Sequence, residues 1–496
     1  MEKNISRRNF LQKSAMATAG AIVASSPLMA KVPLDSQKKK KTAATDKLNI
    51  AGIGIGGRGG GVIRELSSEN IVALCDVDWK YAAGQFQTYP NAKKYKDFRK
   101  LFDEMGNKID AVVVGTADHT HAVIAAQALS MGKHVYCEKP LTHTVYETRL
   151  LTRLAAKHKV ATQMGNQGAS GAGVRQICEA IWSGMIGEVT KVEAFTDRPI
   201  WPQGLETPTE AHTPHPDLDW DLFIGPAPYR PYNEIYHPWN WRGWWDFGTG
   251  ALGDMACHIL QPVVKALNLK SPVAVQGSST SLMTDCAPNA QIAKFVFPAR
   301  DNMPKVGMPR VEVTWYDGGL IPEYPKGWPA GRNMNDSGGA VIFHGTKDTL
   351  ICGCYGVNPW LISGKEIPTP SMTREVPENN HYTDFIRACK ESPESRIKTA
   401  SDFSEAGPLN EMVVMGVLAV RLQGLNRELL WDGDAMKFTN ISPNDSLRMK
   451  VKDGFSIKDG HPTFNNEYTD PINALEFSNE LIRHTYRAGY SLPEMP

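Results

Sequence analysis

The sequence has no excess of charge of either sign. Its 496 residues include 54 lysines and arginines and 53 aspartates and glutamates, so the formal net charge is +1. A nearly neutral chain has no long-range attraction for a polyanion. We therefore expect neither nucleic acid nor an anionic membrane surface as a partner, and we expect a small-molecule ligand instead.

The sequence also lacks a cysteine framework. Its eight cysteines are scattered, and several stand inside apolar runs, where a thiol behaves as a small hydrophobic side chain. Disulfides are therefore not predicted. The one close pair, Cys352 and Cys354, is better explained by a strand or turn than by a metal site.

No run near the N-terminus is long and apolar enough to span a bilayer. Residues 15–30, AMATAGAIVASSPLMA, are modestly apolar and follow Arg7 and Arg8 in SRRNFLQK. This order resembles a bacterial twin-arginine export signal over residues 1–30, followed by a lysine-rich linker over 31–46. We therefore expect an exported, periplasmic protein. The alternative is a basic, unstructured start of a cytosolic protein.

Chain length and apolar rhythm indicate two folded domains. The chain exceeds what one hydrophobic core usually supports, and 42% apolar residues are ordinary for a globular protein. Residues 47–168 alternate apolar strands with helical stretches, which predicts a Rossmann α/β domain with a parallel sheet. Residues 169–430 contain longer alternating segments, which predict an α+β domain with an open, mostly antiparallel sheet and a buried helix near 407–424. Residues 431–496 are predicted to form a polar C-terminal tail.

A glycine-rich turn follows the first predicted strand. In KLNIAGIGIGGRGGG, Gly52, Gly54 and Gly57 fit G-x-G-x-x-G, which permits a tight turn and close approach of a pyrophosphate to the next helix. The second predicted strand ends at Asp76, where a carboxylate accepts from a ribose 2′-hydroxyl and repels a 2′-phosphate. Asp78 stands close enough to share that role. The pattern favours NAD over NADP.

Several polar side chains follow the ends of the predicted parallel strands, where ligands of such sheets bind. They occur in TADHTH, from Thr116 to His121, and in GKHVYCEKPL, where Glu138 and Lys139 precede Pro140. We take ten residues as cofactor-binding candidates: Gly52, Gly54, Gly57, Arg58, Asp76, Thr116, His119, His121, Glu138 and Asn166.

A second polar pair stands in GALGDMACHILQPVVKAL, residues 250–267. This segment predicts a helix on which Asp254 and His258, four residues apart, share one face. A carboxylate beside an imidazole orients it and stabilises its protonated form. A histidine on an apolar helix is more often a buried core residue, so the pair alone leaves both interpretations open.

Taken in order, four motifs resemble the Gfo/Idh/MocA family of nicotinamide-dependent sugar and polyol dehydrogenases. They are the glycine turn, CDVD, TADHTHAVIAAQALSMGKHVYCEKPL and GTGALGDMACHIL, within residues 47–265. The export signal and tryptophan-rich middle resemble an exported branch from sugar-degrading bacteria. The resemblance implies that His258 accepts a hydroxyl proton, that Lys139 binds the same oxygen, and that Asp254 binds a neighbouring hydroxyl and tunes His258. It also implies that Glu138 contacts the nicotinamide ribose.

Six of the twelve tryptophans fall in a proline-rich segment, residues 201–245. Flat indole faces suit the apolar face of a pyranose, but tryptophan is also enriched at subunit interfaces. Both interpretations stay open, and we expect a homo-oligomer. The substrate-binding candidates are Arg242, Trp244, Trp245 and Asp246. His212, His215 and His237 have irregular spacing, and no metal site is predicted.

The leading hypothesis is an NAD-dependent oxidoreductase that transfers a hydride between nicotinamide and a secondary hydroxyl of a sugar or glycoside, for example at carbon 3. A related alternative is an NAD-dependent glycoside hydrolase that works through a transient keto-sugar, although Lys139 speaks against it. A second alternative is a nucleotide-binding protein without catalysis. Because free NAD is scarce outside the cytoplasm, export predicts that NAD is loaded first and held tightly.

Overall fold

The computed structural model describes residues 46–496, apart from residues 302, 304–306 and 336–337. The predicted export signal, residues 1–30, and nearly all of the predicted linker, 31–46, lie outside the described residues. Within the described part, no helix has both the length and the apolar character needed to cross a membrane. All eight cysteines are free and buried, with Cys352 in a strand and Cys354 in the turn after it.

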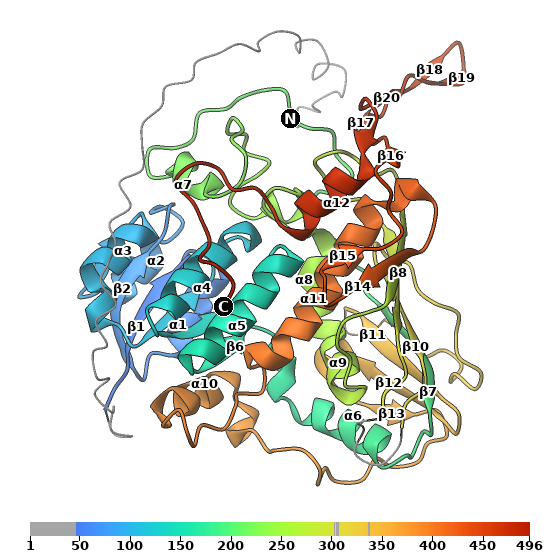
Figure 1. The fold of residues 1–496 in the computed structure, drawn as a ribbon, viewed down its shortest axis with the longest axis horizontal. Helices are drawn as coiled ribbons and strands as arrows, with labels where there is room; N and C mark the ends of the chain where they lie inside the picture. Colours follow the sequence, from blue (N-terminus) through green and yellow to red (C-terminus); the bar gives the residue numbers. More distant parts are fainter. Residues whose placement is uncertain (1–45, 302, 304–306, 336–337) are drawn as a thin grey trace.

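The first domain contains a parallel sheet of six strands in the order β3-β2-β1-β4-β5-β6, drawn in blue and cyan in Figure 1. The strands are β1 Asn49–Ile53, β2 Asn70–Cys75, β3 Lys93–Tyr95, β4 Ala111–Val114, β5 His134–Cys137 and β6 Thr162–Met164. Its helices are α1 Arg58–Glu65, α2 Ala83–Thr88, α3 Phe98–Met105, α4 His121–Ser130 and α5 Val145–His158. Every residue of β4 is buried, as expected for a strand covered on both faces. The predicted Rossmann fold is confirmed.

The second domain contains a sheet of nine strands in the order β13-β12-β11-β7-β10-β9-β8-β14-β15. The strands are β7 Val189–Phe195, β8 Ala274–Ser279, β9 Gln291–Phe297, β10 Val311–Tyr316, β11 Ala340–Gly345, β12 Thr349–Gly353, β13 Trp360–Leu361, β14 Leu429–Asp432 and β15 Lys437–Phe438. Only β7 and β10 pair in parallel within this sheet. The predicted mostly antiparallel sheet is therefore confirmed.

The second-domain part of the chain, up to β14, contains the following helices. They are α6 Ala172–Trp182, α7 Trp220–Ile224, α8 Gly250–Ile259, α9 Gln261–Ala266, α10 His381–Lys390 and α11 Phe403–Arg421. The helix predicted over 250–267 divides at Leu260, and Pro262, which has no N–H to donate, stands in the first turn of α9. Helix α11 is apolar and buried along its length, and it packs between α5 and the large sheet (Figure 1).

Two segments cross the predicted domain limits. Helix α10 returns to the Rossmann domain, where Phe385 and Cys389 join a core cluster with Ile50. The predicted limit at residue 430 falls inside β14, which pairs with β8 and continues the large sheet. The first part of the predicted tail is therefore an edge of that sheet.

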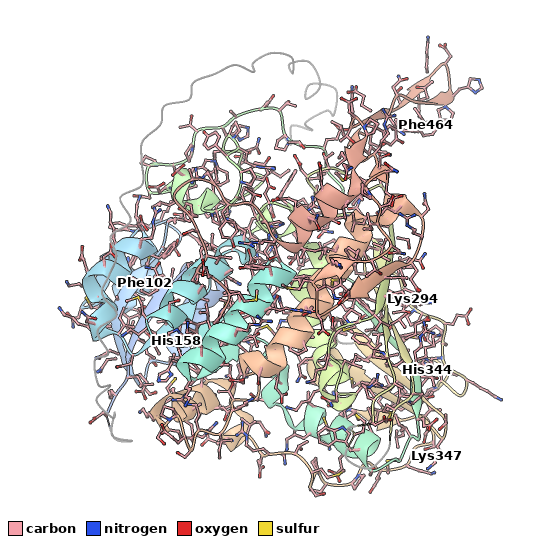
Figure 2. All side chains as sticks on the ribbon, viewed as in Figure 1. Phe102, His158, Lys294, His344, Lys347 and Phe464 are labelled. Carbon is pink, nitrogen blue, oxygen red and sulfur yellow. The ribbon has the colours of Figure 1, made fainter. Side chains whose placement is uncertain are left out.

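The rest of the tail forms a protruding ribbon and a returning segment. The ribbon pairs short strands β16 Ser446–Leu447, β17 Lys450–Lys452, β18 Phe455–Lys458, β19 His461–Phe464, β20 Glu467–Tyr468 and β21 Ile472–Asn473. Figure 2 shows Phe464 near its tip, clear of the body of the molecule. Helix α12, Ala474–Ile482, follows, and the last residues then run back to the Rossmann domain (Figure 1).

A buried amide ties α11 to the turn after β5. Oδ1 of Asn410 accepts from the backbone N–H of Leu141 at 2.8 Å, and Nδ2 donates to the hydroxyls of Thr142 at 3.0 Å and Thr148 at 2.8 Å. Asn410 is fully buried. The turn that carries Glu138 and Lys139 is thereby fixed relative to the second domain.

We predict that Asn410→Leu destabilises the protein by about 3 kcal/mol, because it leaves the buried Leu141 N–H and two hydroxyls without their partner. Thermal unfolding measures the effect. Asn91→Leu, at an exposed position, is the control and should change stability by less than about 0.5 kcal/mol. Equal melting temperatures for the two variants would contradict the structural role of Asn410.

Candidate active site

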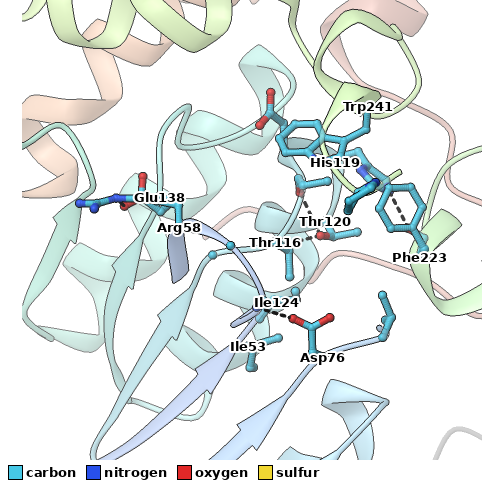
Figure 3. Close-up of a pocket in the computed structure, with 18 of the residues that line it drawn as sticks. Ile53, Arg58, Asp76, Thr116, His119, Thr120, Ile124, Glu138, Phe223 and Trp241 are labelled. Carbon is cyan, nitrogen blue, oxygen red and sulfur yellow. Dashed lines mark hydrogen bonds and ion pairs between the residues drawn. The ribbon is translucent and has the colours of Figure 1, made fainter. Parts of the chain in front are cut away.

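A cavity of about 810 Å³ lies along the carboxyl edge of the parallel sheet, where the two domains meet. Its wall includes the turns after β1, β2, β4 and β5, helix α8 and parts of the tryptophan-rich segment. The cavity falls within the size range of small-molecule and cofactor sites, about 300 to 1,000 Å³. Figure 3 shows part of this wall.

The glycine turn is held in place by Asp76. Oδ2 of Asp76 accepts from the backbone N–H groups of Ile55 and Gly56, both at 2.8 Å, and burial raises the pKa of the carboxyl. Gly54 has φ +76°, and a Cβ there would lie 2.5 Å from the backbone nitrogen of Thr116. The turn therefore needs glycine at this position. Asp76, Gly54 and Thr116 all line the cavity.

Arg58 and Glu138 pair beside this turn, as Figure 3 shows. Nε of Arg58 lies 3.2 Å from Oε1 of Glu138, and its guanidinium also donates to the hydroxyl of Tyr382. Burial raises the pKa of Glu138, and Arg58 opposes that change. The pair places a positive charge at the start of α1.

Lys139 reaches across the domain boundary to Asp254. Its Nζ lies 2.7 Å from Oδ1 of Asp254 and donates to the backbone oxygen of the same residue at 3.0 Å. Nε of Arg242 lies 3.2 Å from Oδ1 as well. Burial lowers the pKa of Lys139, but the Asp254 carboxylate more than offsets this and raises it. Burial would likewise raise the pKa of Asp254, whereas Lys139 and Arg242 bring it below its ordinary value.

His258 stands one helical turn after Asp254, inside the cavity. Within the described residues, its Nδ1 is buried without a hydrogen-bond partner. Its ring centroid lies 4.6 Å from that of Tyr355, which belongs to the turn after β12 and also lines the cavity. Burial and the charge of Lys139 lower the pKa of His258 to about 3, so the imidazole is neutral at physiological pH. The ordinary value near 6.5, which the sequence alone suggests, does not apply here.

Asp118 is a cavity residue that the sequence analysis did not select. It is buried, its Oδ2 accepts from the hydroxyl of Thr249 at 2.8 Å, and burial raises its pKa to about 7. Its position inside TADHTH was a usable signal. The sequence offered no comparable signal for Tyr355, or for Tyr490, which reaches the cavity from the C-terminal segment.

Two predicted cofactor residues of the same motif hold backbone groups instead. His119 lines the cavity, but its ring nitrogens face the carbonyl oxygens of Phe223 and Phe247 at 3.0 and 3.2 Å. The ring of His119 lies beside Phe223 in Figure 3. His121 lies behind the wall, where its Nδ1 is 2.8 Å from the carbonyl oxygen of Pro140. Both histidines position turns of the site.

Other predicted residues lie outside the cavity wall. Gly52 packs under α1, and the Oδ1 of Asn166 accepts from Ser401. Three of the four substrate candidates are also behind the wall: Trp244 and Trp245 are buried in the core, and Asp246 pairs with Arg230.

Arg242 lines the cavity together with Trp239 and Trp241. Its guanidinium carbon lies 3.8 Å from the ring centroid of Trp239 and 4.3 Å from that of Trp241. Trp239 is 47% exposed, whereas the other five tryptophans of the segment are buried. The tryptophan surface in the cavity therefore comes from neighbours of the predicted pair.

The three histidines of the loop do not converge as a group. His215 and His237 place their Nε2 atoms 3.2 and 2.8 Å from Oδ2 of Asp78, while His212 lies near Glu210. Asp78 is thus engaged by two imidazoles. In the described part of the chain, no set of three or more histidine, cysteine, aspartate or glutamate side chains is arranged to hold a metal.

Comparisons with known proteins agree with this architecture. Residues 47–166 match the model of an oxidoreductase family with an NAD-binding Rossmann fold, and residues 170–295 match the model of its C-terminal alpha/beta domain. The chain belongs to this Gfo/Idh/MocA family of oxidoreductases.

Curated relatives of the chain have different activities in their names. A glycosyl hydrolase family 109 protein of Shewanella pealeana is 26% identical over 38% of this chain and 45% of its own length. An inositol 2-dehydrogenase of Salmonella typhimurium is 30% identical over 27% of this chain and 42% of its own length. The matches thus span less than half the length of either relative.

The chain also resembles solved structures in fold. The WlbA dehydrogenase from Bordetella pertussis, solved in complex with NADH and UDP-GlcNAcA, aligns with a TM-score of 0.52 at 16% identity. The alignment covers 78% of this chain and 99% of that protein. At this identity the likeness shows the shared fold.

We predict that Asp118→Asn makes stability less dependent on pH. The ordinary pKa of the carboxyl is 3.8 and burial raises it to about 7 in the folded protein, so ionising it opposes folding as pH rises through this interval. The cost grows by up to about 1.4 kcal/mol per pH unit, and an amide does not incur it.

Thermal unfolding of both proteins between pH 5 and 8 tests this. The advantage of Asp118→Asn should increase from pH 5 to about pH 7, where Asp118 ionises in the folded protein, and then level off. A constant difference across the range would show that Asp118 does not carry the raised pKa.

Proposed function

We propose that this protein is an NAD-dependent oxidoreductase that transfers a hydride between the nicotinamide and a secondary hydroxyl of a sugar or glycoside. The observation that carries the proposal is the Lys139–Asp254 ion pair, which joins the two domains beside the buried, unpaired Nδ1 of His258. Together the three residues can remove the proton of an alcohol: Lys139 is a cation that binds the oxygen, His258 is a base, and Asp254 orients them.

The residues at the other end of the cavity fit a dinucleotide. The glycine turn and the first amides of α1 would hold the pyrophosphate, and Arg58 adds positive charge there. Asp76 uses Oδ2 for the turn and keeps acceptor capacity for a ribose hydroxyl, which favours NAD over NADP. The family relationship and the NADH complex of the WlbA dehydrogenase support this choice. When bound, NAD supplies the carbon that accepts or returns the hydride.

Lys139 and His258 have different roles at the substrate hydroxyl. The Lys139 ammonium, kept charged by Asp254, donates to the oxygen and lowers the cost of its developing negative charge. The neutral His258, which lines the cavity, accepts the hydroxyl proton on its imidazole. Arg242 and Asp254 are placed to bind a neighbouring hydroxyl, and Trp239 offers an exposed aromatic face to a pyranose.

A second candidate function is NAD-dependent glycoside hydrolysis through a transient keto-sugar. The match to a glycosyl hydrolase family 109 protein favours it. Both reactions begin with oxidation of a sugar hydroxyl, so the same Lys139 and His258 serve either. Incubation with a panel of glycosides separates them: keto-sugar with NADH indicates the oxidoreductase, and free sugar without net reduction indicates the hydrolase.

We also propose that the protein is exported by the twin-arginine route as a homo-oligomer with NAD already bound. Arg7 and Arg8 support the route, and the scarcity of NAD outside the cytoplasm supports prior loading. Replacing both arginines by lysine should leave the protein in the cytoplasmic fraction of a producing bacterium. Mass spectrometry of nucleotide released from denatured periplasmic protein tests the loading, and light scattering tests the assembly.

We predict that His258→Asn lowers kcat by about 10²- to 10⁴-fold, because it removes the proton acceptor. NADH binding should be unchanged, since His258 is assigned to the substrate hydroxyl. The exposed His461 provides the control, and His461→Asn should keep full turnover. Steady-state kinetics and NADH fluorescence titration measure the two properties. Undiminished turnover in His258→Asn would remove it as the base.

A further inference from the structure

The last residues of the chain lie over the candidate active site. After α12 ends at Ile482, the segment reaches α7, turns back and ends beside α5, as the dark red trace in Figure 1 shows. Its side chains contact elements of both domains. The predictions from sequence gave this segment no role.

On the Rossmann side the segment is anchored to the start of α5. The hydroxyl of Tyr486 donates to Oε1 of Glu147, whose other oxygen caps the helix by accepting from the N–H of Thr144 at 3.0 Å. The ring of His484 packs edge-on against His143 with centroids 4.9 Å apart. Because Glu147 is buried and belongs to the capping box of α5, this anchor rests on a rigid part of the fold.

On the other side of the cavity the segment is anchored to α7. Nε of Arg487 donates to the backbone oxygen of Gly225 at 3.1 Å, and Nη2 donates to that of Asp221 at 3.0 Å. The same guanidinium forms an ion pair with the Asp221 carboxylate. Gly225 is itself a cavity residue, so this anchor lies at the rim.

Three residues after Arg487, Tyr490 lines the cavity. The guanidinium carbon of Arg99, on α3, lies 4.9 Å from its ring centroid, and Nη1 of Arg99 donates to the oxygen of Gly489 at 3.3 Å. Phe98, next to Arg99, lines the same part of the cavity. Tyr490 thus lies between Arg99 of the Rossmann domain and Arg487, whose guanidinium carbon is 5.8 Å from the Tyr490 ring centroid.

This part of the cavity is the Asp76 end. Asp76 and Val77 follow β2, and Lys96 and Phe98 follow β3, so they form the wall on the outer strands of the sheet. Lys139 and His258 come from β5 and α8 at the other end. Since an acidic residue after the second strand binds the adenosine ribose in a Rossmann site, the adenosine half of a dinucleotide belongs beside Tyr490.

We propose that residues 484–490 form a strap across the adenosine end of the cavity, with Tyr490 as a cofactor-contacting wall, so that a bound dinucleotide leaves only after the strap lifts. The inference rests on the proposed function and deepens it. The strap holds the cofactor by slowing its release, and substrate reaches the opposite end without disturbing it. Slow release of the cofactor would benefit an exported protein, because free NAD is scarce outside the cytoplasm.

The test is the rate at which bound NADH leaves the full-length protein. Protein loaded with NADH is mixed with excess NAD⁺, and the loss of bound NADH fluorescence is followed. Tyr490→Ala should accelerate release about tenfold, the scale expected when one aromatic contact and its support are lost. Tyr468→Ala, on the protruding ribbon, removes an exposed tyrosine far from the cavity and should release NADH at the wild-type rate.

Two further variants make the result specific. Arg487→Ala removes the α7 anchor and the guanidinium whose carbon lies 5.8 Å from the Tyr490 ring centroid, but it keeps the ring itself. It should also accelerate release, which keeps the test valid if Tyr490→Ala folds poorly. Arg99→Ala should also accelerate release, because Arg99 holds both the Tyr490 ring and the backbone oxygen of Gly489. Wild-type release rates in both Tyr490→Ala and Arg487→Ala would overturn the strap. Failure of the wild-type protein to bind any nicotinamide nucleotide would instead overturn the proposed function.

Discussion

The ion pair between Lys139 and Asp254 is the contact on which the candidate site depends. Nζ of Lys139, which follows a Rossmann strand, lies 2.7 Å from Oδ1 of Asp254, which belongs to a helix of the second domain. A largely buried pair is stable only when its remaining hydrogen-bonding capacity is used, and here Lys139 also binds a backbone oxygen while Arg242 shares the carboxylate. Loss of either partner would leave a charge inside the protein, so the two domains are held in one relative position.

The same cluster determines the protonation of its neighbours. Asp254 keeps Lys139 charged, and the positive charge of Lys139 joins burial in keeping His258 neutral. A cation and a neutral imidazole in one cavity can together deprotonate an alcohol, because the cation stabilises the negative charge on the oxygen while the imidazole accepts the proton. In water an imidazole with its ordinary pKa near 6.5 is still partly protonated at neutral pH. Burial and the spacing of the three groups make the division between a charged Lys139 and a neutral His258 more complete.

Sequence patterns predicted the elements more completely than the cavity wall. The six parallel strands, the antiparallel second sheet and the α8 helix with Asp254 and His258 follow from apolar periodicity and glycine placement. Trp244 and Trp245 show what sequence patterns do not predict, namely which side chains of a loop face the cavity. An indole packs equally well in a core or under a sugar, and only the path of the loop puts Trp239 and Trp241 in the cavity and their neighbours behind it. Asp118 was close to the predicted residues because it shares their motif.

The sequence by itself indicated the family and the order of the two domains, because motif order and apolar spacing are local, and the resemblance to that family pointed to Lys139, Asp254 and His258. Tertiary structure alone decided that His119 and His121 hold backbone turns, that Arg58 pairs with Glu138, and that Tyr490 reaches the cavity from the far end of the chain. The reason is physical: contacts between residues hundreds of positions apart depend on how whole elements pack, and no short-range pattern records that packing.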